Sequence, residues 1–248
     1  MSSKTNYSYI GIAFILLVFG ILFVPKIVDR IKNDDVARSD RMSNTPDNNF
    51  SNTEDLLFLE INGETKKVPE FSFINQDGKT ITNKDYLGKV YVVEFFFTTC
   101  PTICPVMNEN LIQIQDRFKS IDNFGVASFT INPSHDTPEV LKAYAEKYGV
   151  TNPNWNMLTG DRDAIYNLAN LGFNLYTAQE DSAAGGFEHS GNFALIDKNG
   201  FIRSRSDQFG NPKIYYRGTI TEKDKYDEDG EEEEISMLKE DIKKLLNE

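Results

Sequence analysis

The 248-residue sequence predicts an α/β domain, in which helices flank a central mixed sheet, carried behind an N-terminal transmembrane anchor. Three observations predict this class. Strand-type and helix-type apolar patterns alternate from Leu56 onward, as expected of α/β folds. Residues 90–97 form a nearly continuous β-branched and aromatic run, typical of a central strand buried on both faces. Residues 5–25 are an uncharged run long enough to span a hydrocarbon core of about 30 Å.

The strands are expected where short β-branched and aromatic runs are bounded by turn residues. Gln76-Asp77-Gly78 predicts a tight turn between two short strands, and Asp197-Lys-Asn-Gly200 predicts a second hairpin. The expected strands are residues 71–74, 80–82, 90–97, 124–131, 193–196 and 201–203.

The helices are expected where apolar residues recur at helical spacing behind a capping residue. Thr137 as N-cap and Pro138 at the first helical position predict a helix over residues 138–148. Asp161 caps a helix expected over residues 161–171. Two further helices are expected over residues 106–119 and over the amphipathic residues 235–246. This order of strands and helices predicts a thioredoxin-like fold.

The N-terminal quarter predicts a tether and not a folded domain. We expect a short tail over residues 1–8, a transmembrane anchor over residues 9–25, a polar flexible linker over residues 26–55 and the domain over residues 56–248. The apolar run lacks the small-x-small site of a cleaved signal peptide and is followed by Lys26, which favours a retained anchor. Basic residues on both sides leave its orientation open.

The charge balance argues against a nucleic-acid partner. A formal net charge of -12 repels polyanions, and no basic stripe offsets it. Residues 221–234 carry nine acidic residues against two lysines and resemble an insertion. A solvated loop is the favoured interpretation of this segment, ahead of a cation or partner site.

The chain has two cysteines, Cys100 and Cys104, which excludes a fold held together by many disulfides. They lie where the strand over residues 90–97 leads into a helix, so we expect both thiols at a helix N-terminus, where the helix dipole favours thiolate. Thiolate is the form required for disulfide exchange and for binding a soft metal. Two buried apolar cysteines are the alternative.

The Cys-x-x-x-Cys spacing permits both a disulfide and a metal site. Helical geometry separates Cα atoms four residues apart by roughly 6.2 Å, within the range that a disulfide tolerates. Two thiolates on one metal lie roughly 3.8 to 4 Å apart, which favours chelation somewhat at this wider spacing. The pair is therefore a candidate metal site and a candidate redox-active pair.

A third ligand has to be His135 or His189, the two histidines of the chain. His135 lies in a polar loop that leads into a helix, where a solvated or capping role is favoured. His189 lies in a glycine-containing loop that leads into a strand, and flexible glycines could bring its ring over the cysteines or mark an exposed turn. The sequence favours His189 only slightly.

At these residues the chain resembles the Sco/SenC family of copper proteins for cytochrome c oxidase assembly. The resemblance covers nearly all of residues 71–246. It rests above all on the cysteine motif with a histidine downstream. The matching segments are Phe95-Phe-Phe-Thr-Thr-Cys-Pro-Thr-Ile-Cys-Pro105, Thr130-Ile-Asn-Pro-Ser-His-Asp-Thr-Pro138, Leu158-Thr-Gly160, Glu188-His-Ser190, Ala194-Leu-Ile-Asp197 and Tyr216-Arg-Gly-Thr219.

The resemblance implies that Cys100, Cys104 and His189 are copper ligands, for Cu(I), Cu(II) or both. It implies a copper metallochaperone, not an enzyme, that acts on the copper-site subunit of cytochrome c oxidase. It also implies one N-terminal membrane helix with the domain on the periplasmic or extracytoplasmic side.

Other functions remain open on the same residues. A membrane-anchored thiol–disulfide oxidoreductase acting on partner cysteines would use the same thiolates. A peroxidase and a stable zinc site are weaker alternatives. The chain also departs from the family pattern, because Thr102, Asn132 and Glu188 stand where the family usually has aspartate. We expect these changes to alter hydrogen bonding around the site.

Overall fold

The computed structural model describes residues 18–19, 56–61, 63–180, 182–206 and 210–248. The chain divides into two units, Met1–Asn52 and Thr53–Glu248, and the fold below is that of the second. Apart from residues 18–19, the expected tail and anchor lie outside the described residues, as does the expected linker. No helix among the described residues combines the length and the apolar character needed to cross a bilayer.

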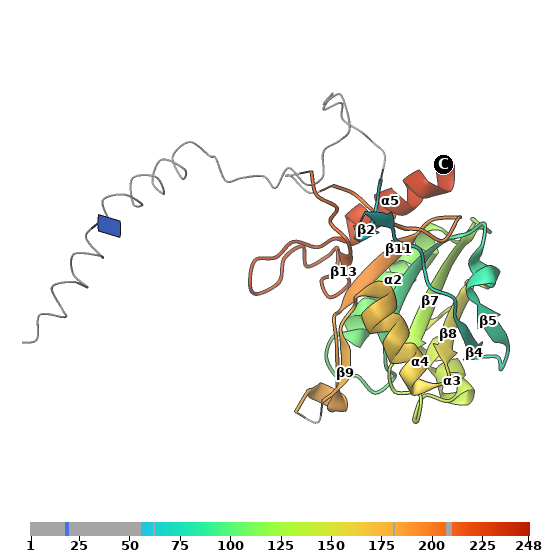
Figure 1. Ribbon diagram of the computed structural model, residues 1–248. Helices are drawn as coiled ribbons and strands as arrows, with labels where there is room; N and C mark the ends of the chain where they lie inside the picture. The colour runs from blue at the N-terminus through green and yellow to red at the C-terminus, as the bar shows by residue number, and fades with distance from the viewer. Residues whose placement is uncertain (1–17, 20–55, 62, 181, 207–209) are drawn as a thin grey trace, which may run out of the picture. The chain divides into compact units, whose positions relative to one another are not determined.

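A mixed sheet forms the centre of the domain (Figure 1). Its strand order is β1-β12-β11-β6-β7-β8-β4-β5, and β13 pairs with β11 beside this path. β6, β7 and β8 are mutually parallel, and the other neighbours are antiparallel. The strands of this sheet are β1 (Leu57–Phe58), β4 (Ser72–Asn75), β5 (Thr80–Thr82), β6 (Val90–Phe96), β7 (Phe124–Thr130), β8 (Trp155–Thr159), β11 (Asn192–Ile196), β12 (Ile202–Ser204) and β13 (Tyr216–Arg217).

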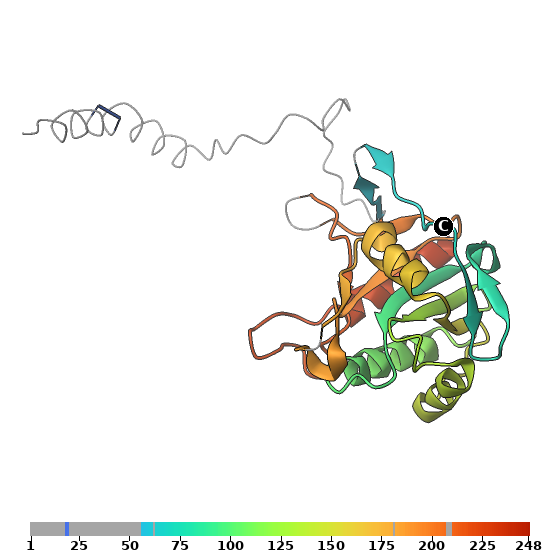
Figure 2. The same cartoon turned by 60° about the horizontal axis from the view of Figure 1, so that its bottom comes forward.

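Helices cover both faces of the sheet (Figure 2). α2 packs against both α3 and α5, and α4 lies on the opposite face from α2 and α3. The helices are α2 (Cys104–Arg117), α3 (Pro138–Tyr148), α4 (Arg162–Asn167) and α5 (Ile235–Asn247). The short helical turns are η1 (Asn83–Tyr86), η2 (Leu168–Phe173) and η3 (Ala184–Gly186). Two small hairpins lie outside the main sheet, β2 (Glu60–Ile61) with β3 (Glu64–Thr65), and β9 (Thr177–Gln179) with β10 (Phe187–His189).

The mixed α/β architecture confirms the predicted fold class, and most expected elements are present within two residues of their predicted ends. α3 has the predicted bounds, because Thr137 accepts from the Val140 amide at 3.4 Å and Gly149 ends the helix in the left-handed conformation. β6 and β7 are buried at every position, as their apolar runs predict.

The expected single helix over residues 161–171 is wrong in its second half. Asp161 caps α4 as predicted, accepting from the Ala164 amide at 2.8 Å, but η2 is a π-helical turn. In a π-turn, residues five apart share a face, and Leu168 and Phe173 are both buried in this way. The wider turn therefore lets η2 present both side chains to the core.

One charged side chain lies inside the central strand. Glu94 of β6 is fully buried, accepts a 2.6 Å hydrogen bond from Ser128 of β7, and has no partner for its second carboxylate oxygen. Burial raises the pKa of Glu94 to about 7 from the usual 4.5, although the Ser128 hydrogen bond lowers it.

The burial of Glu94 predicts a pH dependence of stability. Because its pKa is higher in the folded chain, the folded state binds this proton more tightly than the unfolded state. Glu94 should therefore cost the fold up to about 3 kcal/mol as the pH rises from near 4.5 to 7. The free energy of unfolding, measured with urea across this pH range, should fall for the natural chain relative to Glu94→Gln, whose side chain cannot ionise. If the free energies of the two proteins changed equally with pH, the expectation would be contradicted.

Candidate metal centre

The two cysteines occupy different positions in the turn between β6 and α2. Cys104 is the first residue of α2 and is fully buried. Cys100 precedes the helix, and its amide donates to the Phe97 carbonyl oxygen at 3.2 Å, which folds the chain back after the strand. The prediction that both thiols lie at the helix N-terminus is therefore correct only for Cys104. Both cysteines are free thiols.

His189 reaches the cysteines from the β9–β10 hairpin. It is the last residue of β10 and pairs with Thr177 of β9. Its Nε2 atom lies 3.3 Å from the Cys104 sulfur and 3.9 Å from the Cys100 sulfur. The structure thus brings together Cys100, Cys104 and His189, with their ligand atoms within 4.8 Å of one another. No other such group of metal-ligating side chains occurs in the described part of the chain.

The donor geometry fits a metal ion held by two sulfurs and one imidazole. Metal–sulfur bonds near 2.3 Å and metal–nitrogen bonds near 2.0 Å place the donor atoms about 3.3 to 3.7 Å apart at ordinary bond angles. The observed sulfur–nitrogen distances agree within a few tenths of an ångström. The buried Nδ1 of His189 has no hydrogen-bond partner, so the ring is oriented by packing and presents Nε2 to both sulfurs.

The two sulfurs differ in their protonation. The adjacent Cys104 side chain, and to a lesser extent His189, lower the pKa of Cys100 to about 3 despite partial burial. The interaction with Cys100 and burial raise the pKa of Cys104. The expectation that the helix N-terminus would favour thiolate at both cysteines is wrong for Cys104, because its neighbour already carries the negative charge.

His135 is not part of this group of ligands. Its Nδ1 contacts the Asp136 carboxylate at 2.8 Å, and about half of its side chain is exposed. Asp136 is fully buried and also accepts from the Thr98 amide at 3.0 Å and from the Thr130 hydroxyl at 2.5 Å. The structure thus gives His135 a partly solvated role, as the sequence favours. The sequence did not predict that Asp136 is buried and accepts these hydrogen bonds. The one feature of the sequence that could have indicated it is the position of an acidic residue directly before the Thr137 N-cap.

The three departures from the family pattern occupy different surroundings. Thr102 places its hydroxyl 3.7 Å from the Cys100 sulfur. Asn132 accepts from the Ser134 hydroxyl at 2.9 Å within its own loop. Glu188 is exposed and alternates with His189 along β10, so it points to the other side of the hairpin. Of the three, Thr102 is the one that contacts a candidate ligand.

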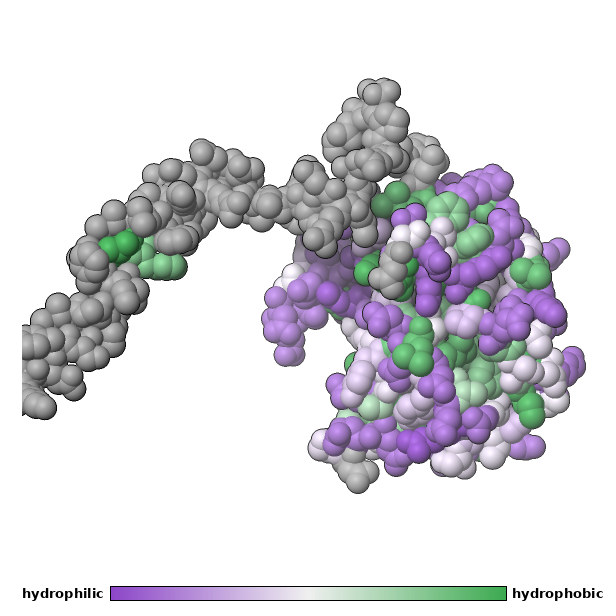
Figure 3. All heavy atoms as spheres, viewed as in Figure 1, coloured by the Kyte–Doolittle hydropathy of each residue, from purple (hydrophilic) through white to green (hydrophobic). Residues whose placement is uncertain are grey.

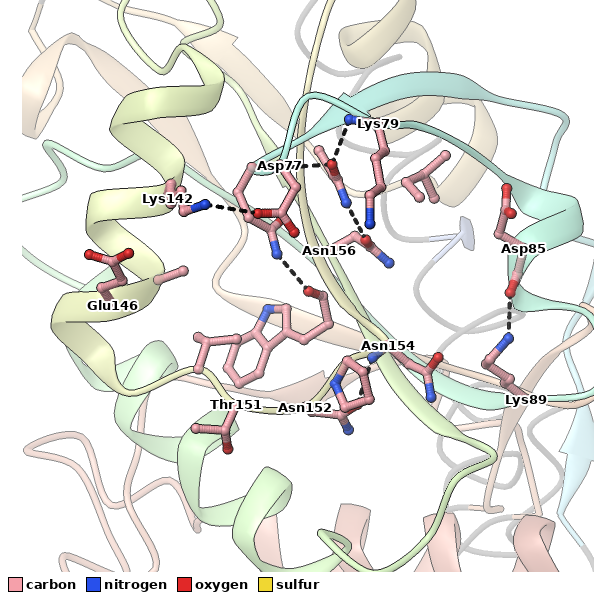
Figure 4. Close-up of a pocket in the computed structure, with 17 residues that line it drawn as sticks. Asp77, Lys79, Asp85, Lys89, Lys142, Glu146, Thr151, Asn152, Asn154 and Asn156 are labelled. Atoms are coloured by element: carbon pink, nitrogen blue, oxygen red, sulfur yellow. Dashed lines mark hydrogen bonds and ion pairs between the residues drawn. The ribbon is translucent and has the colours of Figure 1, made fainter.

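A polar cavity of about 460 Å³ lies at the other end of the parallel strands (Figure 4). Its amide side chains support the fold: Asn75 donates to Asn156 at 2.8 Å, and Gln76 bonds the backbone on both sides of Asn156. Lys142 pairs with Asp77 at 3.3 Å. The polar side chains that line the cavity therefore stabilise the fold, and the candidate functional site is the one at the two cysteines.

The acidic segment follows β13 and is exposed over residues 223–232. It folds back on itself through a bridge between Tyr226 and Glu232, and Arg217 pairs with Glu231 at 3.0 Å. Hydrophilic side chains cover most of the face in Figure 3, with apolar ones interspersed.

Fold and site together define a thioredoxin-like domain in which a Cys-x-x-x-Cys motif and a histidine distant in sequence form one candidate metal centre. The family model for SCO1/SenC matches residues 60–221. The chain belongs to the SCO1/SenC family, and the acidic segment lies almost wholly beyond the match.

A curated relative agrees with this assignment. The SCO1 protein homolog of Bacillus subtilis is 37% identical over 95 residues, which cover 38% of this chain and 49% of the relative. The match thus spans about half the length of that curated relative.

Solved structures share the fold. A SCO1/SenC family lipoprotein from Bacillus anthracis is 30% identical, with a TM-score of 0.60 over 73% of this chain and 95% of the other. BsSco, a member of the Sco family of cytochrome c oxidase assembly proteins, is 25% identical, with a TM-score of 0.58 over 73% and 94%. Bradyrhizobium japonicum ScoI, solved with copper bound, is 20% identical, with a TM-score of 0.55 over 72% and 99%, and shows the fold alone.

The unequal pKa values of the two cysteines predict a single thiolate in the metal-free protein. The ultraviolet thiolate absorbance of the reduced chain should correspond to one sulfur well below neutral pH and should fade only near pH 3. Cys104→Ala should raise the pKa of Cys100 toward its usual value, because the largest influence that lowers it is removed. His189→Ala should raise it less. The prediction would be contradicted if the thiolate absorbance appeared only in the pH range in which free cysteine ionises.

Proposed function

We propose that this protein is a copper metallochaperone that binds one copper ion through Cys100, Cys104 and His189. The observation that carries the proposal is the approach of His189 Nε2 to both sulfurs, at 3.3 and 3.9 Å. Two thiolates and an imidazole suit Cu(I), and Cu(II) also accepts this donor set. A three-ligand shell leaves room for a ligand from a receiving protein, as transfer requires.

The receiving protein in this proposal is the copper-site subunit of cytochrome c oxidase, and delivery would build its binuclear copper centre. The support comes from family membership and from BsSco, which belongs to a family of cytochrome c oxidase assembly proteins. Cargo copper enters and leaves, so no chemical conversion is required of the chain.

Copper titration of the reduced full-length chain tests the binding. We expect one copper per chain with sub-micromolar affinity, and a loss of on the order of 100-fold or more for Cys100→Ser, Cys104→Ser and His189→Ala, because each removes a ligand. His135→Ala is the matched control and should bind as the natural chain does. Tight binding by all three ligand variants would refute the proposal.

Delivery is tested by mixing the copper-loaded chain with the metal-free copper-site subunit. Metal analysis of the separated subunit should find copper on it, two loaded chains supplying the two ions of its binuclear centre, and the His135→Ala control should deliver equally well. Copper retained on the chain at equilibrium would argue against the assembly role.

A thiol–disulfide oxidoreductase is the second candidate, favoured by the low pKa of Cys100. In this reaction, the Cys100 thiolate attacks a partner disulfide and releases one partner thiol. Cys104 then resolves the mixed disulfide, so the chain is oxidised and the partner is reduced. His189→Ala separates the two functions, because exchange should survive this change while copper affinity falls.

We propose that residues 9–25 anchor the chain in a membrane, with the domain on the extracytoplasmic side. The uncharged run in the sequence and the family resemblance support this location. Deletion of residues 1–25 should move the protein from the membrane fraction to the soluble fraction. For the full-length chain, protease added outside intact cells whose wall has been removed should digest the domain. Full-length protein recovered in the soluble fraction would contradict the anchor.

A further inference from the structure

The ring of Phe97 connects the cysteine turn to the histidine hairpin. Phe97 follows β6, is fully buried, and accepts the backbone hydrogen bond from Cys100. On its other side the ring centroid lies 5.1 Å from that of Phe187 and 5.8 Å from that of His189, the latter nearly edge-on at 80°. The side chain of Phe97 thus packs against the hairpin that carries His189, while its backbone carbonyl accepts the hydrogen bond from the Cys100 amide.

The backbone of the hairpin also rests directly on this ring. A Cβ atom at Gly185 would lie 2.8 Å from Cε2 of Phe97, closer than real Cβ atoms come, and 3.2 Å from Cδ of Pro101, which is a tight contact. Gly185 also has φ +76°, a conformation that side chains disfavour. Gly186 has a similar φ of +83°, yet its Cβ would meet nothing within 4 Å. The two neighbouring glycines therefore share a backbone strain and differ in the contact with Phe97.

The base of the hairpin is fixed separately. Thr177, the strand partner of His189, exchanges backbone hydrogen bonds of 3.0 Å with the Asn170 side chain in η2. This attachment holds the backbone near His189. It does not orient the imidazole, whose Nδ1 has no hydrogen-bond partner and whose Nε2 faces the two sulfurs. Packing against the ring therefore contributes to its orientation.

We propose that Phe97 is a positioning residue, whose contacts with Gly185, Phe187 and His189 hold the His189 imidazole against the two sulfurs. The inference rests on the proposed copper binding and assigns Phe97 no contact with the metal. A ligand held in place before the metal arrives loses less conformational entropy on binding, so the Phe97 contact raises affinity. Loss of the contact leaves two thiolates as a weaker, two-ligand site.

The two glycines provide the test. In the full-length chain, Gly185→Ala should lower copper affinity by about tenfold to a hundredfold, the usual effect of disturbing a ligand's support. Gly186→Ala, which introduces the same backbone strain without the clash, is the matched control and should change affinity less than about twofold. Phe97→Leu alone should also lower copper affinity, because it removes the ring that packs against His189.

A second measurement needs no copper. In the metal-free chain, the ring protons of His189 should show a ring-current shift in the NMR spectrum from Phe97. The shift should persist in Gly186→Ala and be reduced in Gly185→Ala. Equal shifts and equal affinities for the two glycine variants would overturn the inference, even if Phe97→Leu does not fold. Failure of the natural chain to bind copper would instead overturn the proposed function, while the NMR comparison would still decide the role of Phe97.

Discussion

The candidate metal centre depends on the approach of His189 Nε2 to two sulfurs that come from a different part of the chain. Cys100 lies in the turn that joins β6 to α2, and Cys104 is the first residue of α2, so both cysteines are held by the central sheet and by this helix. The hairpin that carries His189 is not a strand pair of that sheet. The site therefore joins a rigid part of the fold to a small appended element, and its geometry depends on how well that element packs.

Electrostatics give the two sulfurs separate tasks. The pKa of Cys100 is lowered and that of Cys104 is raised, so the metal-free site favours a thiolate at Cys100. In the proposed site, binding a metal through both sulfurs would release the Cys104 proton, which would make affinity depend on pH. Glu94 lies in the strand that leads to Cys100, and its raised pKa limits how much further negative charge the interior carries near neutral pH.

The sequence was sufficient for the elements that bury whole runs of apolar residues. β6, β7 and α3 follow from hydrophobic pattern and capping, and the cysteines follow from their spacing at a strand–helix junction. β8 was not predicted, because Asn156 interrupts its apolar pattern and is satisfied only by Asn75 and Tyr86, which are distant in sequence. The choice between His135 and His189 could not be made from local patterns, because the sequence places both in loops. The expected loop is wrong for His189, which ends β10, and only tertiary packing brings it to the sulfurs.

The division between a rigid sulfur pair and an appended histidine bears on how copper would be passed on. A chaperone must hold its cargo firmly and still release a ligand to the receiving protein without unfolding. Moving either cysteine would disturb β6 or α2, which belong to the core. Moving His189 requires only that a two-stranded hairpin shift, and such hairpins have little stability of their own. In the proposed transfer, the ring of His189, which lacks a hydrogen bond at Nδ1, would accordingly be the ligand to leave first. In the proposed transfer, the packing of the hairpin against Phe97 would then set the balance between holding copper and giving it up.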